Sequence, residues 1–118
     1  MPREFGRNRR IADQVQREVA AMVQAELNSG QYGLVTISGA DVSPDLKQAK
    51  VYFTCFGGKL KPAELERHLN QLAPHFRHQL ATMLTTRSVP KLHFSFDESV
   101  ERGSRINSLL GSLRRDDE

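Results

Sequence analysis

A β-hairpin is predicted by residues 34–56, LVTISGADVSPDLKQAKVYFTCF. Its two ends, 34–42 and 50–56, are rich in β-branched and aromatic residues, which fit a pleated and half-buried surface. Between them, Ser43-Pro44-Asp45 supplies turn chemistry, because proline presets φ and aspartate bonds to its own backbone. Side chains alternate between the faces of a strand, so the second strand divides into two sets: Val51, Phe53 and Cys55 on one face, and Tyr52, Thr54 and Phe56 on the other.

Amphipathic helices flank this hairpin in the sequence. From Asn8 to about Asn28, apolar residues recur at steps of three and four, which predicts a helix capped by Asn8 and stopped by Gly30. Residues 29–33 are expected to form a loop. A second apolar stripe begins after Pro62, a residue suited to a first helical turn. Its members are Leu65, Leu69, Leu72, Phe76, Leu80 and Met83.

Pro74 lies in the middle of the second stripe. A proline inside a helix removes one backbone hydrogen bond and clashes with the preceding turn, at about 3 kcal/mol in a straight helix. The apolar spacing nevertheless keeps its phase on both sides of Pro74. We therefore predict two helices that meet at a kink, with Pro74 opening the second helix.

A last strand is predicted over residues 88–96, where Leu92, Phe94 and Phe96 alternate with polar residues. Pro90 near its start indicates either an edge strand or the beginning of a strand. The chain between the second and third strands is long enough for a crossover, which allows this strand to pair in parallel. A short helix, which Ser104 can cap, is predicted in the tail.

The order of these elements predicts an α+β domain in which helices cover one face of a small three-stranded sheet. A chain of 118 residues fits one domain. We assign residues 1–7 to a flexible basic arm, residues 8–97 to the folded domain and residues 98–118 to a C-terminal extension.

The composition argues against several classes of protein. The single cysteine, Cys55, rules out an intrachain disulfide and a zinc site built on several cysteines, and it favours a reducing, cytoplasmic compartment. No apolar run approaches the roughly 18 residues that a membrane span needs. No apolar segment follows the N-terminal arginines, as it would in a signal peptide.

Positive charge is concentrated in two regions of a chain whose net charge is only +3. The first ten residues carry four arginines against one acid, and residues 67–96 contain no acid and all four histidines. The cations are Arg3, Arg7, Arg9 and Arg10 in the first region, and Arg67, Arg77, Arg87 and Lys91 in the second. Such a distribution fits a footprint for phosphates, and an uneven solvated surface is the alternative. Arginines at the start of a helix interact unfavourably with its macrodipole, and a binding role would explain why they are tolerated there.

Catalytic and metal-binding motifs are not recognisable in the sequence. His75 and His78 have a spacing that can hold a metal on a helix, but structural sites ordinarily need four ligands. Gly57-Gly58-Lys59 lacks the complete phosphate-loop pattern and fits a loop after a strand. Cys55 lies in an apolar strand and fits a buried small hydrophobe. We therefore predict no metal, no cofactor and no enzymatic activity.

Several segments, in order along nearly the whole chain, resemble the bacterial ribosome-binding factor A family. They are Arg7 and Arg10 before the first apolar stripe, 42–46 and 49–52 in the hairpin, 87–94 leading to Asp97, and 103–106 with 109–110 in the tail. The resemblance implies a type II KH-like fold in the order α-β-β-α-α-β. It places the family's interhelical Ala-x-Gly kink at Ala73, Pro74 and His75, where His75 stands in place of the glycine.

The same resemblance implies a non-catalytic, monomeric RNA-binding factor. Such a factor would bind the immature 30S ribosomal subunit and assist late maturation of 16S rRNA, including its 5′ region, and it is associated with growth in the cold. A ribosome-associated GTPase would promote its release. The alternative is a basic protein-interaction module that docks on an acidic protein. RNA contacts are expected from Arg3, Arg7, Arg9, Arg10, Arg77, Arg87, Lys91 and Arg105.

Overall fold

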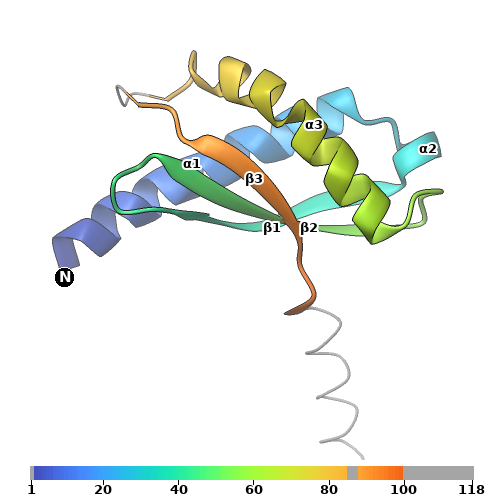
Figure 1. Cartoon of the computed structure of the whole chain (residues 1–118), viewed down its shortest axis with the longest axis horizontal. Coiled ribbons are helices and arrows are strands. Elements are labelled where there is room, and N and C mark those ends of the chain that lie inside the picture. Colours follow the sequence, from blue (N-terminus) through green and yellow to red (C-terminus); the bar gives the residue numbers. More distant parts are fainter. Residues whose placement is uncertain (1, 85–87, 100–118) are drawn as a thin grey trace, which may run out of the picture.

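The fold is a three-stranded sheet with helices packed on one of its faces (Figure 1). The computed structural model describes the backbone of residues 2–84 and 88–99, and the side chains from residue 8 onward within those ranges. Its elements are α1 (Pro2–Glu26), α2 (Ser29–Tyr32), β1 (Leu34–Val42), β2 (Gln48–Phe56), α3 (Pro62–Leu80) and β3 (Lys91–Phe96). The predicted α+β class and the predicted sheet are confirmed.

The sheet has the strand order β1-β2-β3. The predicted hairpin forms, with β1 and β2 antiparallel, and β3 pairs in parallel with β2 at the edge of the sheet. Pro90 is buried and directly precedes β3, as a residue without a backbone N–H should at the start of an edge strand. A long crossover through α3 is what permits the parallel pairing.

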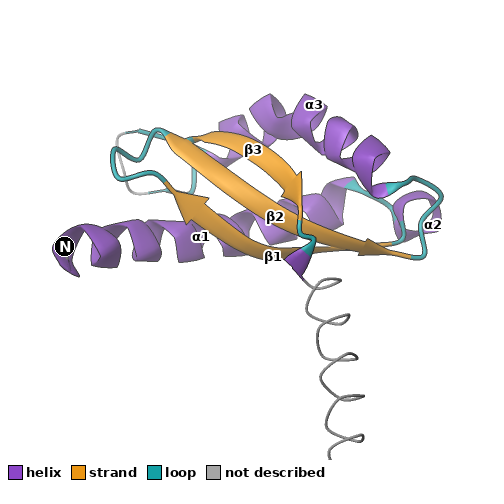
Figure 2. Cartoon of the chain, turned by 60° about the horizontal axis from the view of Figure 1, so that its bottom comes forward, coloured by secondary structure: helices purple, strands orange, loops and turns teal. Residues whose placement is uncertain are grey.

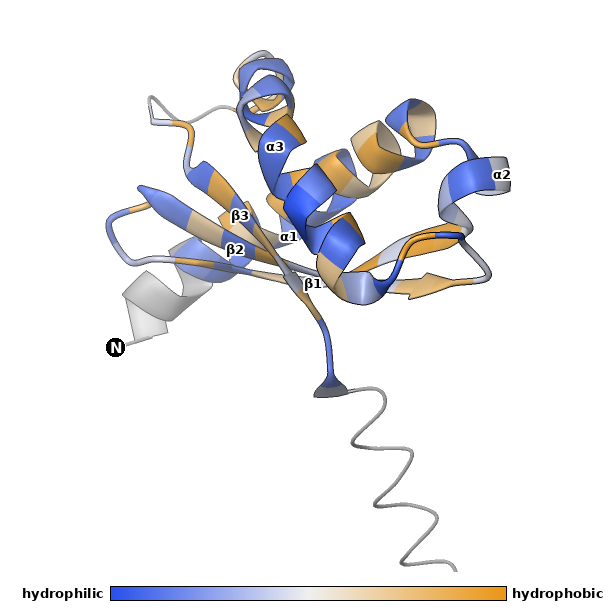
Figure 3. Cartoon of the chain, turned by 45° about the vertical axis from the view of Figure 1, so that its right-hand side comes forward, coloured by the Kyte–Doolittle hydropathy of each residue, from blue (hydrophilic) through white to orange (hydrophobic). Residues whose placement is uncertain are grey.

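The core lies between the sheet and the two long helices, which stand behind the sheet in Figure 2. α1 packs mainly against β1, and α3 packs mainly against β3. Val51 and Phe53 share one face of β2, as the alternation predicted, and both are fully buried there. Phe76 of α3 meets Phe94 of β3 edge to face, with ring centroids 5.8 Å apart. Figure 3 shows hydrophobic and hydrophilic residues on different sides of α3, as expected of an amphipathic helix.

The first helix begins at Pro2 rather than at Asn8, so the prediction of a loose arm over residues 1–7 is wrong for residues 2–7. Proline suits a first helical position because the N–H that it lacks has no partner there. Arginine and glutamate are good helix formers and continue the helix from that point. The arginines at 9 and 10 therefore lie beyond the first turn of α1, where the macrodipole no longer opposes them strongly.

A short helix, α2, replaces the loop that was predicted over residues 29–33. The side chain of Asn28 caps it by accepting a hydrogen bond of 2.8 Å from the Gln31 backbone N–H. Gly33 follows with φ of 72°, and a Cβ there would lie 2.3 Å from the Phe56 carbonyl oxygen. This corner of the chain therefore requires glycine, because any side chain would collide with the end of β2.

The second helical segment is one helix rather than two. α3 runs continuously through Pro74, so the prediction that Pro74 opens a second helix is wrong. The proline removes only the bond to the carbonyl of Asn70, whereas Leu69, Phe76 and Leu80 keep their buried positions on both sides of it. Packing of the apolar stripe on the sheet outweighs the loss of one helical hydrogen bond.

Two sequence predictions fall outside the described residues. The tail helix expected from Ser104, and most of the C-terminal extension, belong to this part of the chain. Among the residues that the structure does describe, no helix is long and apolar enough to cross a membrane.

Candidate nucleic-acid interface

An open groove of about 820 Å³ lies where the C-terminal half of α3, the turn between β1 and β2, and the start of β3 meet. These three segments gather at one end of the sheet in Figure 1. The groove brings together two of the predicted RNA-binding residues, Arg77 and Lys91, with the predicted kink residue Pro74. Its lining consists of Lys47, Gln48, Pro74, Arg77, His78, Ala81, Ser88, Val89 and Lys91, and none of these described residues is acidic.

Arg77 lies in the last turn of α3 and reaches across to the segment before β3. Its Nε and Nη2 both donate to the Val89 carbonyl oxygen, at 3.1 and 2.9 Å. A guanidinium has five N–H donors, so this contact leaves donors for a further acceptor. The side chain is exposed, and its two bonds to one carbonyl oxygen restrain the position of the guanidinium.

Lys91 and Lys47 reach the groove because their backbones are paired. The Lys91 N–H donates to the Lys47 carbonyl oxygen at 2.9 Å, where β3 begins beside the hairpin turn. Both side chains are exposed. Sequence reasoning missed Lys47, since the pairing that brings it to Lys91 depends on the parallel register of the sheet.

The hairpin turn holds Lys47 through a network of side-chain hydrogen bonds. The Ser43 hydroxyl donates to Asp45 Oδ1 at 2.6 Å, and the same oxygen accepts from the Lys47 N–H at 3.0 Å. These two bonds, the Ser43 bond first, lower the pKa of the Asp45 carboxyl below its ordinary value of 3.8. The predicted turn chemistry of Ser43-Pro44-Asp45 therefore also orders one wall of the groove.

The three predicted kink residues point to different surroundings. Pro74 is exposed and lines the groove, and Ala73 is buried beside a smaller adjoining hollow of about 230 Å³. His75 instead faces the end of α1, with its Nε2 3.9 Å from Glu26 Oε2. His75 is therefore not among the described residues that line the groove, and the side chain that replaces the family's glycine is directed at α1.

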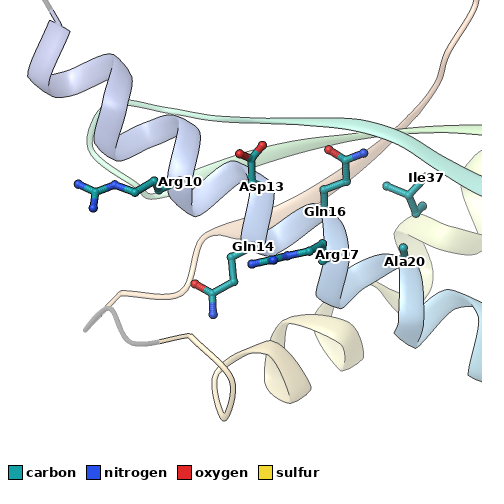
Figure 4. Close-up of a pocket in the computed structure, with 7 residues that line it drawn as sticks. All are labelled: Arg10, Asp13, Gln14, Gln16, Arg17, Ala20 and Ile37. Atoms are coloured by element: carbon teal, nitrogen blue, oxygen red, sulfur yellow. The ribbon is translucent and has the colours of Figure 1, made fainter.

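The arginines of α1 form a separate basic region. Arg9 and Arg10 are exposed, and Arg10 lines an open hollow of about 730 Å³ on α1 (Figure 4). Arg17 and Asp13 share that hollow, so an acid accompanies its cations. No described residue lines both this hollow and the groove of Lys47, Arg77 and Lys91. The side chains of Arg3, Arg7, Arg87 and Arg105 lie outside the described part of the chain.

Metal chemistry finds no support in the residues that were considered for it. His78 lines the groove, whereas His75 faces Glu26. Over residues 8–84 and 88–99, no three of the metal-binding residue types come together in a possible site.

The chain is similar to a family of known proteins over most of its length. The family model of ribosome-binding factor A matches residues 7–110. Ribosome-binding factor A of Thioalkalivibrio sulfidiphilus (strain HL-EbGR7) is 38% identical over 117 residues, which are 99% of this chain and 91% of that protein. The protein of the same description from Pseudomonas putida (strain ATCC 700007) is 43% identical over 112 residues, covering 93% of this chain and 85% of the relative.

Solved structures show the same fold. The crystal structure of ribosome-binding factor A from Thermus thermophilus gives a TM-score of 0.65 at 23% identity, covering 75% of this chain and 93% of the other. A second similar chain is a homology model of the Thermus thermophilus factor, fitted into a cryo-electron microscopy map of a complex with 30S. Its TM-score is 0.60 at 22% identity, covering 74% of this chain and 91% of the other. The chain belongs to the ribosome-binding factor A family.

Proposed function

We propose that the chain binds the small ribosomal subunit, with the groove of Lys47, Arg77 and Lys91 as its main contact to rRNA phosphates. The observation that carries the proposal is the convergence of three cations, from three separate elements, on a groove without an acid among its described lining residues. Phosphate contacts from lysine and arginine supply affinity and fix orientation. A similar family member that was fitted into a complex with 30S supports the choice of partner.

The proposed mechanism is binding without chemistry. The factor would associate with immature 30S subunits in the cytoplasm and favour one local conformation of 16S rRNA by binding it more tightly than its alternatives. Stabilising that conformation would assist late maturation, including that of the 5′ region. A ribosome-associated GTPase would then release the factor by changing the conformation that it binds.

A second candidate function uses the same groove for an acidic protein surface. Such a partner would be steered electrostatically by Lys47, Arg77 and Lys91, since these cations attract carboxylates as they attract phosphates. RNA remains the first proposal because the restrained Arg77 guanidinium keeps further donors for a phosphate, and because a similar family member was fitted into a complex with 30S.

Sucrose-gradient fractionation of cell lysate tests the partner directly. Under the proposal, the full chain co-migrates with free 30S subunits and is depleted from translating ribosomes. Nuclease treatment before pull-down should release the chain from its partner, because under the proposal rRNA holds the complex together. Retention of a partner after complete nuclease digestion would favour the acidic-protein function instead.

A further inference from the structure

The face of the sheet that turns away from α1 and α3 carries a cationic and aromatic cluster. In β2, Lys50 and Tyr52 lie on this face, which is uncovered by the helices in Figure 2. In β3, Lys91 and His93 share it, and both are exposed. Lys91 also lines the groove described above, so the cluster begins at the groove and continues over the sheet.

Tyr52 is the one large ring in the middle of this face, and its cross-strand neighbours are small. It is paired with Gly39 of β1 on one side and with Ser95 of β3 on the other. A Cβ added to Gly39 would lie 3.9 Å from the Tyr52 ring, so the glycine leaves this space to the ring. The neighbouring strands therefore place no bulky side chain over Tyr52 at this register. The ring is half-buried, and a planar group would reach its face where the Lys50 ammonium now lies.

Positive charge surrounds this ring on the side toward the groove. Lys50 Nζ lies over the Tyr52 ring, 5.6 Å from its centroid, and Lys50 is paired with His93. Two acids flank Tyr52 at equal distance in register. Asp41 lies opposite Lys50 on the β1 side, and Asp97 follows β3 and accepts a 2.6 Å hydrogen bond from the Ser38 hydroxyl. Lys50 and Lys91 therefore lie between Tyr52 and the groove. Gln48, which pairs with Lys91, is four residues before Tyr52, a distance of roughly 13 Å along β2.

We infer that this face is a second contact for single-stranded RNA, in which a base stacks on Tyr52 while Lys50 and Lys91 meet the adjacent phosphates. The combination of an accessible ring with cations on one side is what sequence-tolerant binding of single strands uses. The inference extends the proposed function, because the strand would reach Tyr52 from the groove. A peptide would be expected to pair with a strand edge, whereas this cluster lies on the face of the sheet.

Tyrosine fluorescence gives a direct test, because the chain has two tyrosines and no tryptophan. Replacement Tyr32→Phe leaves Tyr52 as the only emitter and removes a single 3.1 Å hydrogen bond to His68. Titration of this variant with an eight-nucleotide uridine oligomer should quench its emission to saturation, after correction for absorption by the RNA. Unchanged emission at saturating oligomer would overturn the stacking contact.

Affinity measurements separate stacking from a structural role of the ring. Tyr52→Leu should bind the oligomer roughly tenfold more weakly, whereas Tyr52→Phe, which keeps the ring, should stay within about twofold of the parent chain. Melting temperatures of both variants ensure that binding is compared between folded proteins. If Tyr52→Leu and Tyr52→Phe lose affinity for the oligomer equally, the ring itself is not the contact.

The outcomes also distinguish this inference from the proposed function. If Tyr52→Leu binds 30S subunits and the oligomer normally while a groove variant loses both, the inference fails and the proposed function stands. If Tyr52→Leu loses 30S binding without any quenching by RNA, the face contacts a ribosomal protein and the inference also fails. A parent chain that binds neither 30S subunits nor the oligomer overturns both.

Discussion

The molecule has two basic regions that are built in opposite ways. Arg9 and Arg10 are adjacent in sequence and exposed on a single helix, α1. Lys47, Arg77 and Lys91 come from the hairpin turn, from α3 and from β3, and they meet only when the sheet has formed. A dense run of charge in the sequence therefore marks only the simpler region, and the groove is a product of topology.

The surroundings of the two regions also differ. The hollow on α1 includes Asp13 among its described lining residues, and the groove includes no acid among its own. The Arg77 guanidinium is anchored to Val89 by two hydrogen bonds, whereas the turn holds Lys47 through its backbone N–H. Anchored cations lose less conformational freedom on binding than exposed ones on a helix surface. The groove should thus contribute more to RNA affinity per charge.

Removing the groove cations should have the largest effect. We expect Lys47→Ala, Arg77→Ala and Lys91→Ala together to lower affinity for purified 30S subunits about a hundredfold at about 0.1 M salt. The slope of log affinity against log salt should flatten by about 2, because each lost phosphate contact removes the release of a counterion. Equilibrium binding over a range of salt concentrations measures both quantities.

A matched control removes three cations from elsewhere on the domain. Lys59, Lys61 and Arg67 are exposed and do not line the groove. Their combined replacement by alanine changes the net charge equally, so it separates a local contact from a general effect of charge. Equal losses in the two triple variants would show that the groove has no special role.

A smaller effect is expected from the arginines at the start of the chain. Replacement of Arg7, Arg9 and Arg10 by alanine should weaken 30S binding about tenfold and flatten the salt slope by about 1. Because the two regions share no described lining residue, this loss should add to that of the groove variant. An unchanged slope would remove α1 from the binding surface and leave the groove, with the sheet face that continues from it, as the basic contact.

Local patterns in the sequence predicted most of the fold. Alternation placed Val51 and Phe53 correctly on the same face of β2, because strand periodicity depends only on neighbouring residues. The continuity of α3 could not be predicted in this way. Pro74 has a local cost, and the packing of Phe76 and Leu80 against the sheet, which decides the outcome, is not local.

The candidate site was predicted only in part, for a related reason. Arg77 and Lys91 were singled out by an acid-free stretch and by a family resemblance. Lys47 lies in a turn with no distinctive charge pattern, and the bond between its carbonyl and the Lys91 N–H sets its place. The position of His75 beside Glu26 likewise depends on how α3 crosses α1. Contacts between distant elements set these positions, and a single sequence contains no direct signal for them.

Arg77 has both a structural and a binding role, which a change of side chain can separate. Arg77→Ala removes two hydrogen bonds to Val89, so we expect the free energy of unfolding to fall by about 1 kcal/mol. That loss corresponds to a melting temperature lower by about 4 °C. Lys91→Ala, whose described bond to Lys47 uses only backbone atoms, should melt like the parent chain.

Arg77→Lys retains the charge but not the forked pair of donors, so it should melt like Arg77→Ala and bind 30S subunits better. Thermal unfolding and 30S binding of the two variants together measure the two roles. If neither variant lowers the melting temperature, the contact to Val89 does not hold this segment in solution.

The smallest effect concerns the turn that positions Lys47. The hydrogen bonds from the Ser43 hydroxyl and the Lys47 N–H lower the pKa of Asp45, so its NMR titration midpoint should lie below 3.8. A carboxyl whose pKa is lowered by folding stabilises the fold above its unfolded pKa, and this contribution disappears as the pH falls through the folded pKa. The turn should therefore loosen only in acid. A midpoint at or above 3.8 would show that these bonds do not persist.

Asp45→Ala extends that test to the groove at neutral pH. Without the carboxylate, the Lys47 N–H loses its acceptor and the lysine is held less firmly, so 30S binding should weaken about twofold. The same replacement in a Lys47→Ala background should change affinity no further, because the side chain that the turn positions is then absent. Asp45→Ala should also leave unchanged the loss of 30S affinity that replacement of Arg9 and Arg10 causes, because α1 does not depend on this turn. A twofold loss that persists without Lys47 would instead mean that Asp45 acts on another part of the groove.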